Sequence, residues 1–198
     1  MSVDTVTTFV ALLSVLCLVF LLATAVLAVV GRVRGGLTDT LGDLRQGFAD
    51  LAVPMAFAVA LASTLGSLYM SEVAKFEPCE LCWYQRICMY PLTVLLGVAW
   101  IRGRDLAVRW YVWPLCAVGF GFSVFHYLVE RFPETVTYTC NDEVPCSFVW
   151  VWKFHFLSLP AMAGTGFATI AALLAIAAAD RRRAGTSTTP SPIEESAP

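Results

Sequence analysis

The sequence predicts an all-α membrane protein: a four-helix transmembrane bundle plus one extra N-terminal transmembrane helix. Of the 198 residues, 58% are hydrophobic and 14% are charged, whereas a soluble domain carries about 25% charged residues. The hydrophobic residues are gathered into windows without charge, most of them long enough to supply the roughly 20 apolar residues with which a helix crosses a bilayer. These windows are 5–31, 51–71, 87–101, 110–129 and 154–179.

The first helix is expected at 8–30, and with the cytoplasmic linker that follows it makes an N-terminal unit, 1–50. A cleaved signal peptide is the alternative for this segment. The residues before the apolar run carry no basic side chain and include Asp4, whereas a signal peptide begins with a positively charged region. A retained membrane anchor is therefore favoured.

Four further helices are expected, and they form a core over 51–183. The third apolar window is short, but Leu81–Tyr84 extends it beyond Arg86, whose long side chain can reach the membrane surface. Pro91 lies inside this helix and should kink it. The tail 184–198, rich in Ser, Thr and Pro, is expected to be disordered. The four helices are placed at 51–71, 81–101, 110–128 and 157–179.

The basic residues orient the helices. Nine of the thirteen Lys and Arg residues fall on one side of the membrane if all five segments span it. By the positive-inside rule this side is the cytoplasm. The N-terminus and the loops 72–80 and 129–156 then face outward, and the C-terminus faces the cytoplasm. The nine are Arg32, Arg34, Arg45, Arg102, Arg104, Arg109, Arg181, Arg182 and Arg183.

The composition argues against three other classes of protein. Seven cysteines in 198 residues are too few for a small secreted disulfide scaffold, in which Cys exceeds about 8–10%. The abundance of apolar residues excludes disorder outside the tail. The formal net charge of -2 argues against nucleic acid as a partner, because domains that bind it carry a basic surface.

The predicted topology sorts the seven cysteines into two groups. Cys17, Cys88 and Cys116 fall inside expected spans, where they should pack as small apolar residues. The other four fall in or beside the outward segments, where an oxidising environment lets disulfides persist. These four form two close pairs, Cys79 with Cys82 and Cys140 with Cys146.

The first pair, Cys79 and Cys82, is a C-x-x-C at the start of the third helix. Cysteines three apart share a helix face, and a helix N-terminus favours the thiolate. Arg86 lies one turn beyond Cys82, where its charge could stabilise a thiolate or an anion formed beside it. The alternative for Arg86 is a snorkelling side chain that only anchors the helix.

The second pair, Cys140 and Cys146, flanks a turn-forming segment that can bring the two Cα atoms to the roughly 4.4–6.8 Å that a disulfide needs. Such a disulfide is either a static clip or a labile bond open to attack by another thiolate. No metal is expected, because zinc sites use closely spaced pairs and this pair has five intervening residues. A c-type haem is disfavoured because Trp83, not His, follows the C-x-x-C.

The run Cys79-Glu-Leu-Cys82-Trp-Tyr-Gln85-Arg86 resembles the signature of the disulfide bond formation protein B family, DsbB and its BdbC-type relatives. In both, C-x-L-C-x-x-Q/E-R opens a transmembrane helix, and a second outward cysteine pair lies between the next two helices. The resemblance covers about 51–179. It implies a thiol-disulfide oxidoreductase of the bacterial inner or plasma membrane that acts in electron transport and protein folding. Its partner would be an extracytoplasmic thioredoxin-like (DsbA-like) protein, and its electron acceptor a membrane quinone, ubiquinone or menaquinone.

Carried over by position, the resemblance also implies roles for the cysteines. Cys79 and Cys82 would be the quinone-linked pair, with Cys82 handing electrons to a quinone that Arg86 helps to hold. Cys140 and Cys146 would exchange with the partner, whose thiolate would attack Cys140. The freed Cys146 would then reduce the Cys79–Cys82 disulfide at Cys79. The second pair is more closely spaced here than in the best-known members, and this bears on the relay between pairs.

Three more positions complete the expectations. Gln85 replaces an acidic residue of the best-known members, which should affect only tuning. His126, near the outer end of the fourth helix, is taken as a second quinone-binding residue, with a structural pairing to Glu130 as the alternative. His155 is expected at the membrane interface, within an aromatic run, 150–156, that forms an interfacial belt or a segment lying in the membrane plane.

Two other functions remain open at the level of the sequence. One is a non-enzymatic membrane scaffold with two structural disulfides. The other is a quinone-coupled enzyme of the vitamin K epoxide reductase type. The latter is disfavoured because its C-x-x-C follows its loop cysteines, whereas here Cys79 and Cys82 come first.

Overall fold

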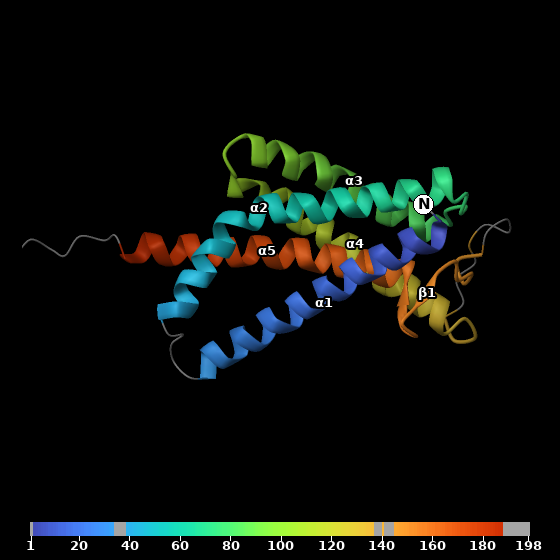
Figure 1. Cartoon of the computed structure of the whole chain (residues 1–198), viewed down its shortest axis with the longest axis horizontal. Helices are drawn as coiled ribbons and strands as arrows, with labels where there is room; N and C mark the ends of the chain where they lie inside the picture. The colour runs from blue at the N-terminus through green and yellow to red at the C-terminus, as the bar shows by residue number, and fades with distance from the viewer. Residues whose placement is uncertain (1, 34–38, 137–139, 141–144, 188–198) are drawn as a thin grey trace, which may run out of the picture.

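The computed structural model describes residues 2–33, 39–136, 140 and 145–187, and it confirms the all-α membrane fold. Its five long helices are joined by short elements (Figure 1). A π-helical segment, η1 (Tyr69–Val73), continues α2, and a 3-10 turn, η2 (Leu106–Val108), precedes α4. The long helices are α1 (Val3–Val33), α2 (Asp39–Leu68), α3 (Glu80–Ile101), α4 (Arg109–Arg131) and α5 (Leu159–Ser187).

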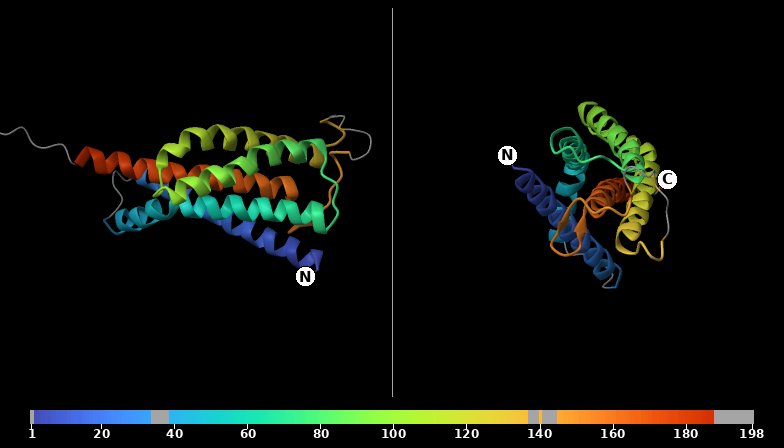
Figure 2. Two further views of the ribbon diagram at one scale, coloured as in Figure 1. Left: turned by 90° about the horizontal axis from the view of Figure 1, so that it is seen from above. Right: turned by 90° about the vertical axis from the view of Figure 1, so that its right-hand side faces the viewer.

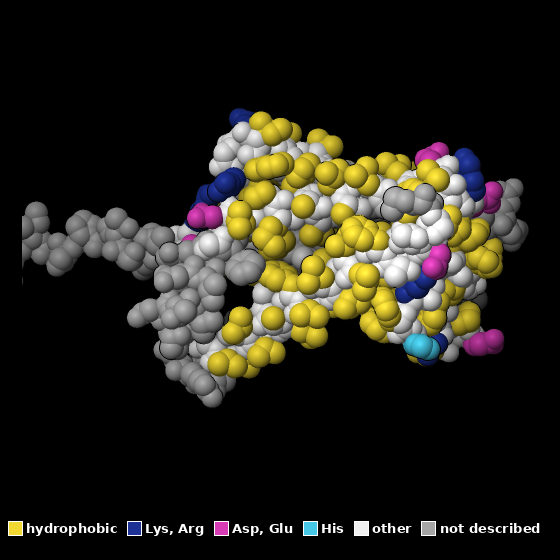
Figure 3. Space-filling model, in the orientation of Figure 1, with side chains coloured by type: hydrophobic (Ala, Val, Ile, Leu, Met, Phe, Trp, Pro, Cys, Tyr) yellow, Lys and Arg dark blue, Asp and Glu magenta, His cyan; other side chains and the backbone are white. Residues whose placement is uncertain are grey.

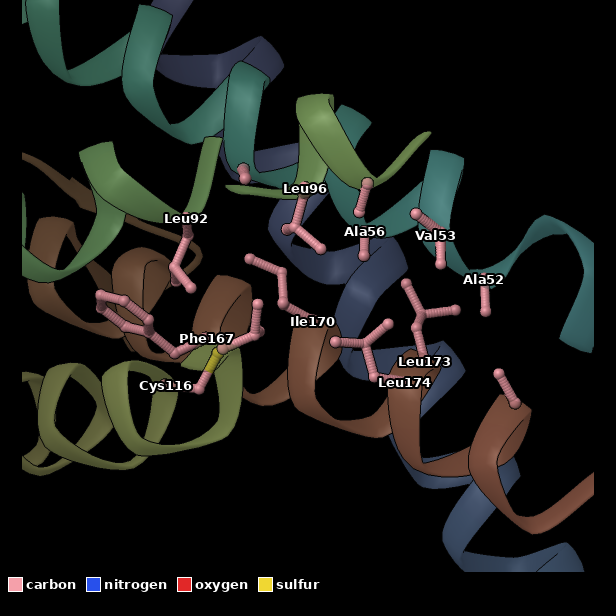
Figure 4. Close-up of a cluster of buried hydrophobic side chains, with 14 of the residues drawn as sticks. Ala52, Val53, Ala56, Leu92, Leu96, Cys116, Phe167, Ile170, Leu173 and Leu174 are labelled. Carbon is pink, nitrogen blue, oxygen red and sulfur yellow. The ribbon is translucent and has the colours of Figure 1, made fainter. Parts of the chain in front are cut away.

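Helix α5 is the centre of the bundle. It packs against α2, α4 and α1, and the end-on view shows the other helices around it (Figure 2). Of its most apolar segment, 56% is buried inside the protein, compared with 6% for α1. The central cluster joins α5 to α2, α3 and α4 (Figure 4). Its fully buried members include Leu92, Leu96, Phe167, Ile170, Leu173 and Leu174.

The helix interfaces are close at a few positions with small side chains. Gly119 of α4 lies directly against the Phe167 ring of α5, in a place where a Cβ atom would overlap the ring. Between α2 and α3, the hydroxyls of Thr64 and Thr93 lie 2.8 Å apart and share a hydrogen bond. Such contacts hold bundles together in lipid, where apolar burial gives little drive for helix association.

Four of the described helical segments are long and apolar enough to cross a membrane. Helix α3 is not among them, because the polar residues of its first turns, such as Gln85 and Arg86, lower its mean hydropathy. It nevertheless forms between α2 and α4 as a helix of 22 residues. Hydrophobic side chains cover the middle of the molecule, whereas charged ones gather toward its two ends (Figure 3), as a multi-pass membrane protein requires. The four segments are Val3–Gly31, Ala49–Val73, Leu106–Arg131 and Leu159–Arg182.

The helices are longer than the charge-free windows. Helix α2 begins at Asp39, so much of the expected linker is helical, whereas its apolar span, Ala49–Val73, agrees with the expected 51–71. Helix α5 ends at Ser187, so residues 184–187 of the expected disordered tail are helical, and 188–198 lie outside the described residues. The absence of charge marks only the part of a helix that lies in lipid. The backbone hydrogen bonds of a helix do not require lipid, so the helix extends beyond this part into sequence that carries charges.

The aromatic run before α5 forms a β-hairpin. Strand β1 (Trp152–Lys153) pairs antiparallel with β2 (Leu157–Ser158), and the turn places Phe154 and His155 at φ of 53° and 65°. This hairpin was not expected from the sequence, because two-residue strands have no detectable period. It lies at the same end of the bundle as the start of α1 (Figure 1).

Candidate functional site

Cys79 is the N-cap residue of α3. Its backbone is extended, with φ of −67° and ψ of 172°, and its Sγ accepts a hydrogen bond of 3.4 Å from the backbone N–H of Cys82. A side chain at this position commonly accepts from the third residue of the helix. The same turn brings the two Sγ atoms to 2.9 Å. The C-x-x-C spacing therefore places both sulfurs at the positive end of α3, as expected.

The environment of Cys79 favours its thiolate. The pKa of the Cys79 thiol is lowered to about 4, first because the Cys82 thiol donates a hydrogen bond to it, and also because of His126 and the backbone N–H of Cys82. Burial acts in the opposite direction, since it disfavours the charged form. A thiol with these neighbours is a good leaving group in disulfide exchange.

His126 of α4 completes this cluster. Its Nε2 lies 3.6 Å from the Sγ of Cys79, and the Gln85 side chain lies 3.2 Å from its Nδ1. A Gln85 amide that donates to Nδ1 leaves the imidazole proton on Nε2, where it points to the sulfur. The Glu130 carboxylate is 4.0 Å from the same Nε2. His126 is therefore beside a cysteine and also near Glu130, and its expected contact with a quinone remains a prediction.

The second cysteine pair is a disulfide. Cys140 and Cys146 are bonded, with their Cα atoms 5.8 Å apart, and residues 141–144 between them lie outside the described residues. Both half-cystines are buried in one cluster with Cys79 and Val129. Topology thus brings the two pairs, which are far apart in the sequence, into the same small region where α3 begins and α4 ends.

A cavity of about 640 Å³ begins on the other side of the first pair. Cys82, Gln85 and Arg86 of α3 line it, together with residues of α1, α2 and α5. Met70, the segment Phe76–Pro78 and Trp150 also contribute to its walls. Arg86 is fixed there, because its Nη2 donates a 3.0 Å hydrogen bond to the backbone oxygen of Ser67 and its guanidinium lies 5.3 Å from the centre of the Trp83 ring. Most of the lining is apolar, for example Phe20, Met55, Met89, Met162, Ala163 and Leu173.

The two sulfurs of the C-x-x-C therefore face different surroundings. Cys82 lines the cavity, whereas Cys79 does not and instead contacts His126 and the cluster that holds the disulfide. His126 is likewise not among the described residues that line the cavity. The pair lies between a disulfide and a largely apolar cavity.

A metal ion has three possible ligand atoms at this place. The Sγ atoms of Cys79 and Cys82 and a ring nitrogen of His126 lie within 4.8 Å of one another. Two thiolates and an imidazole suit zinc or copper, but a disulfide between the two cysteines would remove two of the three ligands. The four cysteines of the two pairs do not form one ligand set, because Cys140 and Cys146 are bonded to each other.

Sequence reasoning missed two members of the site. Gln85 was noted only as a departure from an acidic residue, yet it contacts His126. Cys17, expected only to pack, lines the cavity together with other residues of α1. The position of Gln85 one turn from Cys82 was a usable signal, whereas nothing in the sequence shows which face of α1 meets the bundle.

Comparisons with known proteins agree with this geometry. The family described as "Disulfide bond formation protein DsbB" matches residues 49–179. Disulfide bond formation protein C of Bacillus subtilis (strain 168) is 45% identical over 116 residues, which are 58% of this chain and 83% of that protein. A probable disulfide formation protein of Deinococcus radiodurans is 45% identical over 134 residues, 63% of this chain and 87% of that protein.

A third relative is less similar in sequence, but a larger share of its length is matched. Probable disulfide formation protein C 1 of Bacillus anthracis is 38% identical over 128 residues, 64% of this chain and 91% of that protein. No solved structure matches the chain. In all of these comparisons the matched part leaves a large share of the chain unmatched, and the family match begins after α1 ends.

Proposed function

The chain belongs to the DsbB family of disulfide bond formation proteins, and from this premise we propose that it reoxidises an extracytoplasmic thioredoxin-like (DsbA-like) protein and passes the electrons to a membrane quinone. Membership of the family makes it a membrane oxidoreductase of disulfide formation. The observation that carries the finer proposal is the position of Cys79 and Cys82 between the Cys140–Cys146 disulfide and the cavity lined by Arg86.

The cavity fits a quinone. Its volume of about 640 Å³ lies within the roughly 300–1,000 Å³ usual for small-molecule sites, which are mostly apolar with a few polar groups. Arg86 supplies a charged donor for a quinone carbonyl oxygen. One turn further along α3, the Tyr90 hydroxyl is buried without a hydrogen-bond partner among the described residues. When bound, a quinone supplies an acceptor for two electrons and two protons.

Exchange begins at the outer disulfide in this proposal. A partner thiolate attacks the Sγ of Cys140, which forms a mixed disulfide and releases Cys146 as a thiolate. The cycle starts with Cys79 and Cys82 oxidised to a disulfide, and Cys146 attacks the Cys79 sulfur of this bond and frees Cys82 as a thiolate. The second partner thiol attacks the mixed disulfide, so that the partner leaves oxidised and Cys140 becomes a thiolate.

The second half of the cycle returns the outer disulfide and reduces the C-x-x-C. Cys140 attacks Cys146, and Cys79 leaves as the thiolate that its low pKa favours. The two electrons from the partner now reside on Cys79 and Cys82, with one proton shared across the 2.9 Å between their sulfurs. Cys82 faces the cavity, so the electrons leave through it as the Cys79–Cys82 disulfide forms again.

The same proposal includes the orientation in the membrane. At one end of the bundle lie the C-x-x-C and the outer disulfide, and we place this end outside the cytoplasm of a bacterial cell, together with the N-terminus. At the other end Arg181 of α5 donates a 3.2 Å hydrogen bond to the backbone oxygen of Arg104. Two of the arginine-bearing segments therefore meet, and the positive-inside rule puts them in the cytoplasm with the C-terminus.

The proposed function is tested by the redox state of the thioredoxin-like partner in cells that carry Cys82→Ser. Reduced partner should accumulate, because the electrons can no longer leave the C-x-x-C. Cys88→Ser is the matched control, since Cys88 lies on the same helix in the hydrophobic core and outside the site. A partner that stays fully oxidised in Cys82→Ser cells would contradict the proposal and favour a scaffold with structural disulfides.

A further inference from the structure

Helix α1 is one wall of the cavity that contains Cys82 and Arg86. It contributes Leu13, Ser14 and Cys17, among others, to the lining. The family match begins at residue 49, so this wall comes from a part of the chain that the family does not account for. Without α1 the lining residues of α2, α3 and α5 would face the lipid on that side.

The helix is held against the bundle at its outer end. A narrow stripe of small side chains, Thr7, Ala11 and Ser14, is 4%, 0% and 7% exposed. It recurs at intervals of four and three residues, so it forms one face, with which α1 packs on α5. Ala11 belongs to one cluster with the hairpin before α5. Asp4 also forms an ion pair of 2.6 Å with Lys153 of that hairpin.

Toward its other end α1 diverges from α5 (Figure 1). Leu16 lines the cavity and is also 65% exposed, so the cavity reaches the lipid-facing surface beside this residue. A molecule that occupies the end near Arg86 can therefore extend past α1 into the membrane. The route is continuous with the acceptor site, because all of these residues line one cavity.

The side chains that α1 contributes can bind an apolar chain and little else. Among Leu13, Ser14 and Cys17, the Ser14 hydroxyl is already used, since it donates a 3.0 Å hydrogen bond to the backbone oxygen of Val10. No Lys, Arg, Asp or Glu of α1 is among the described residues of the lining. The polar groups suited to a quinone ring, those of Arg86 and Gln85, are on α3.

We propose that α1 is a specificity-determining element, which binds the apolar side chain of the quinone while the ring lies at the Arg86 end of the cavity. This rests on the proposed function. It predicts that the enzyme distinguishes quinones by the length of their side chain through residues of α1. The helix would thus tune which membrane quinone is used without touching the reacting atoms.

The test compares Leu13→Trp with Leu12→Trp in the purified full-length protein in lipid nanodiscs. Leu13 lines the cavity, whereas its neighbour Leu12 is 54% exposed and is not part of the lining. The two changes are chemically identical and one residue apart. Initial rates of partner oxidation, and equilibrium binding of the quinone without the partner, are measured with a short-chain and a long-chain form of the same quinone, once as ubiquinone and once as menaquinone. Leu13→Phe, a smaller increase in volume, takes the place of Leu13→Trp if the tryptophan variant does not fold.

For Leu13→Trp we expect the KM for the long-chain quinone to rise about tenfold, the size of effect that added volume has in a filled site. The KM for the short-chain quinone should change less than about twofold, and Leu12→Trp should change neither. Equal KM values for the long-chain quinone in wild type, Leu13→Trp and Leu13→Phe would overturn the role of α1 alone. A wild-type protein that uses neither quinone, long or short, would overturn the proposed function and this inference together.

Discussion

The Nε2 of His126 lies 3.6 Å from the Sγ of Cys79, although the two residues are 47 positions apart in the sequence. Helices α3 and α4 pack side by side to bring them together. The imidazole thus stands next to the one cysteine of the C-x-x-C that faces away from the cavity. In the proposed exchange this is the sulfur that forms and then breaks the bond to the second pair, so its charge state should affect the rate of that exchange.

The first prediction concerns the acidity of Cys79. His126→Ala removes the hydrogen bond and the electrostatic attraction through which the imidazole lowers the pKa of this thiol, so the pKa should rise above about 4 while staying below the ordinary value because Cys82 still donates. The thiolate is the reactive form. Alkylation of Cys79 by iodoacetamide in the reduced protein, followed by mass spectrometry across pH, should therefore have its midpoint at higher pH in the variant.

The control for that measurement is His155→Ala. His155 is exposed in the hairpin turn and contacts no cysteine among the described residues, so its loss should leave the alkylation midpoint of Cys79 where it is. An equal shift in both histidine variants, or no shift in either, would show that His126 does not set the acidity of Cys79.

The second prediction concerns Arg86 and the electron acceptor. Arg86→Gln removes a charged donor from the cavity, and a hydrogen bond to a charged group contributes about 1.5–3 kcal/mol. The KM for quinone should rise about tenfold or more, whereas the affinity for the reduced partner protein should be unchanged. Steady-state kinetics with each substrate varied in turn separate the two effects.

Arg109→Gln is the matched control for Arg86→Gln. Both guanidinium groups lie over a neighbouring tryptophan ring, at 5.3 Å for Arg86 and Trp83 and at 5.2 Å for Arg109 and Trp110. Arg109 is at the start of α4, however, and is not among the described residues that line the cavity. If both variants raised the KM for quinone equally, a general effect of lost charge would replace the specific role of Arg86.

The third prediction concerns the order of attack at the outer disulfide. In Cys146→Ala the unpaired Cys140 thiolate can attack the disulfide of the oxidised partner, which breaks that bond and links the partner to Cys140, and no Cys146 is present to displace the partner. A covalent complex should therefore accumulate and be visible on non-reducing gels, with Cys140 as the linked residue by mass spectrometry. The reciprocal variant, Cys140→Ala, should give little complex. Accumulation of a complex through Cys146 in Cys140→Ala, and not in the other variant, would reverse the order.

Local signals in the sequence were enough to place the helices and the first cysteine pair. The charge-free windows gave the membrane segments because lipid excludes charge, and the C-x-x-C was placed correctly at the start of α3 because capping depends on neighbours in the chain. The same windows could not give the start of α2 at Asp39. A helix that leaves the membrane continues in sequence that is no longer purely apolar.

The contacts between helices could not be predicted in this way. The approach of His126 to Cys79, and the cavity wall formed by α1, depend on which face of each helix meets its neighbour. In segments that are apolar on every side, such as α1, the sequence has no polar face from which to read that rotation. Small residues such as Ala11 and Ser14 mark the interface only once the packed helix is known.

The last prediction concerns the packing of α4 on α5, which holds the cysteine cluster and the cavity in register. At an ordinary helix position Gly→Ala stabilises by up to about 1 kcal/mol. At Gly119 the new methyl would overlap the ring of Phe167, which is fully buried and cannot move away freely, so Gly119→Ala should instead destabilise by about 1–3 kcal/mol. Unfolding of the purified protein in mixed detergent micelles measures the change.

Gly121→Ala makes the same substitution two residues away on α4, where a Cβ atom meets nothing within 4 Å. It should therefore be neutral or slightly stabilising. Adding Phe167→Leu to Gly119→Ala should restore part of the lost stability, because the smaller side chain leaves room for the methyl. The effects of the two substitutions on the free energy of unfolding should therefore not add, since the two residues are in contact. Equal stabilities of the two single alanine variants would mean that α4 and α5 do not approach through Gly119, and the position of His126 beside Cys79 would then need another explanation.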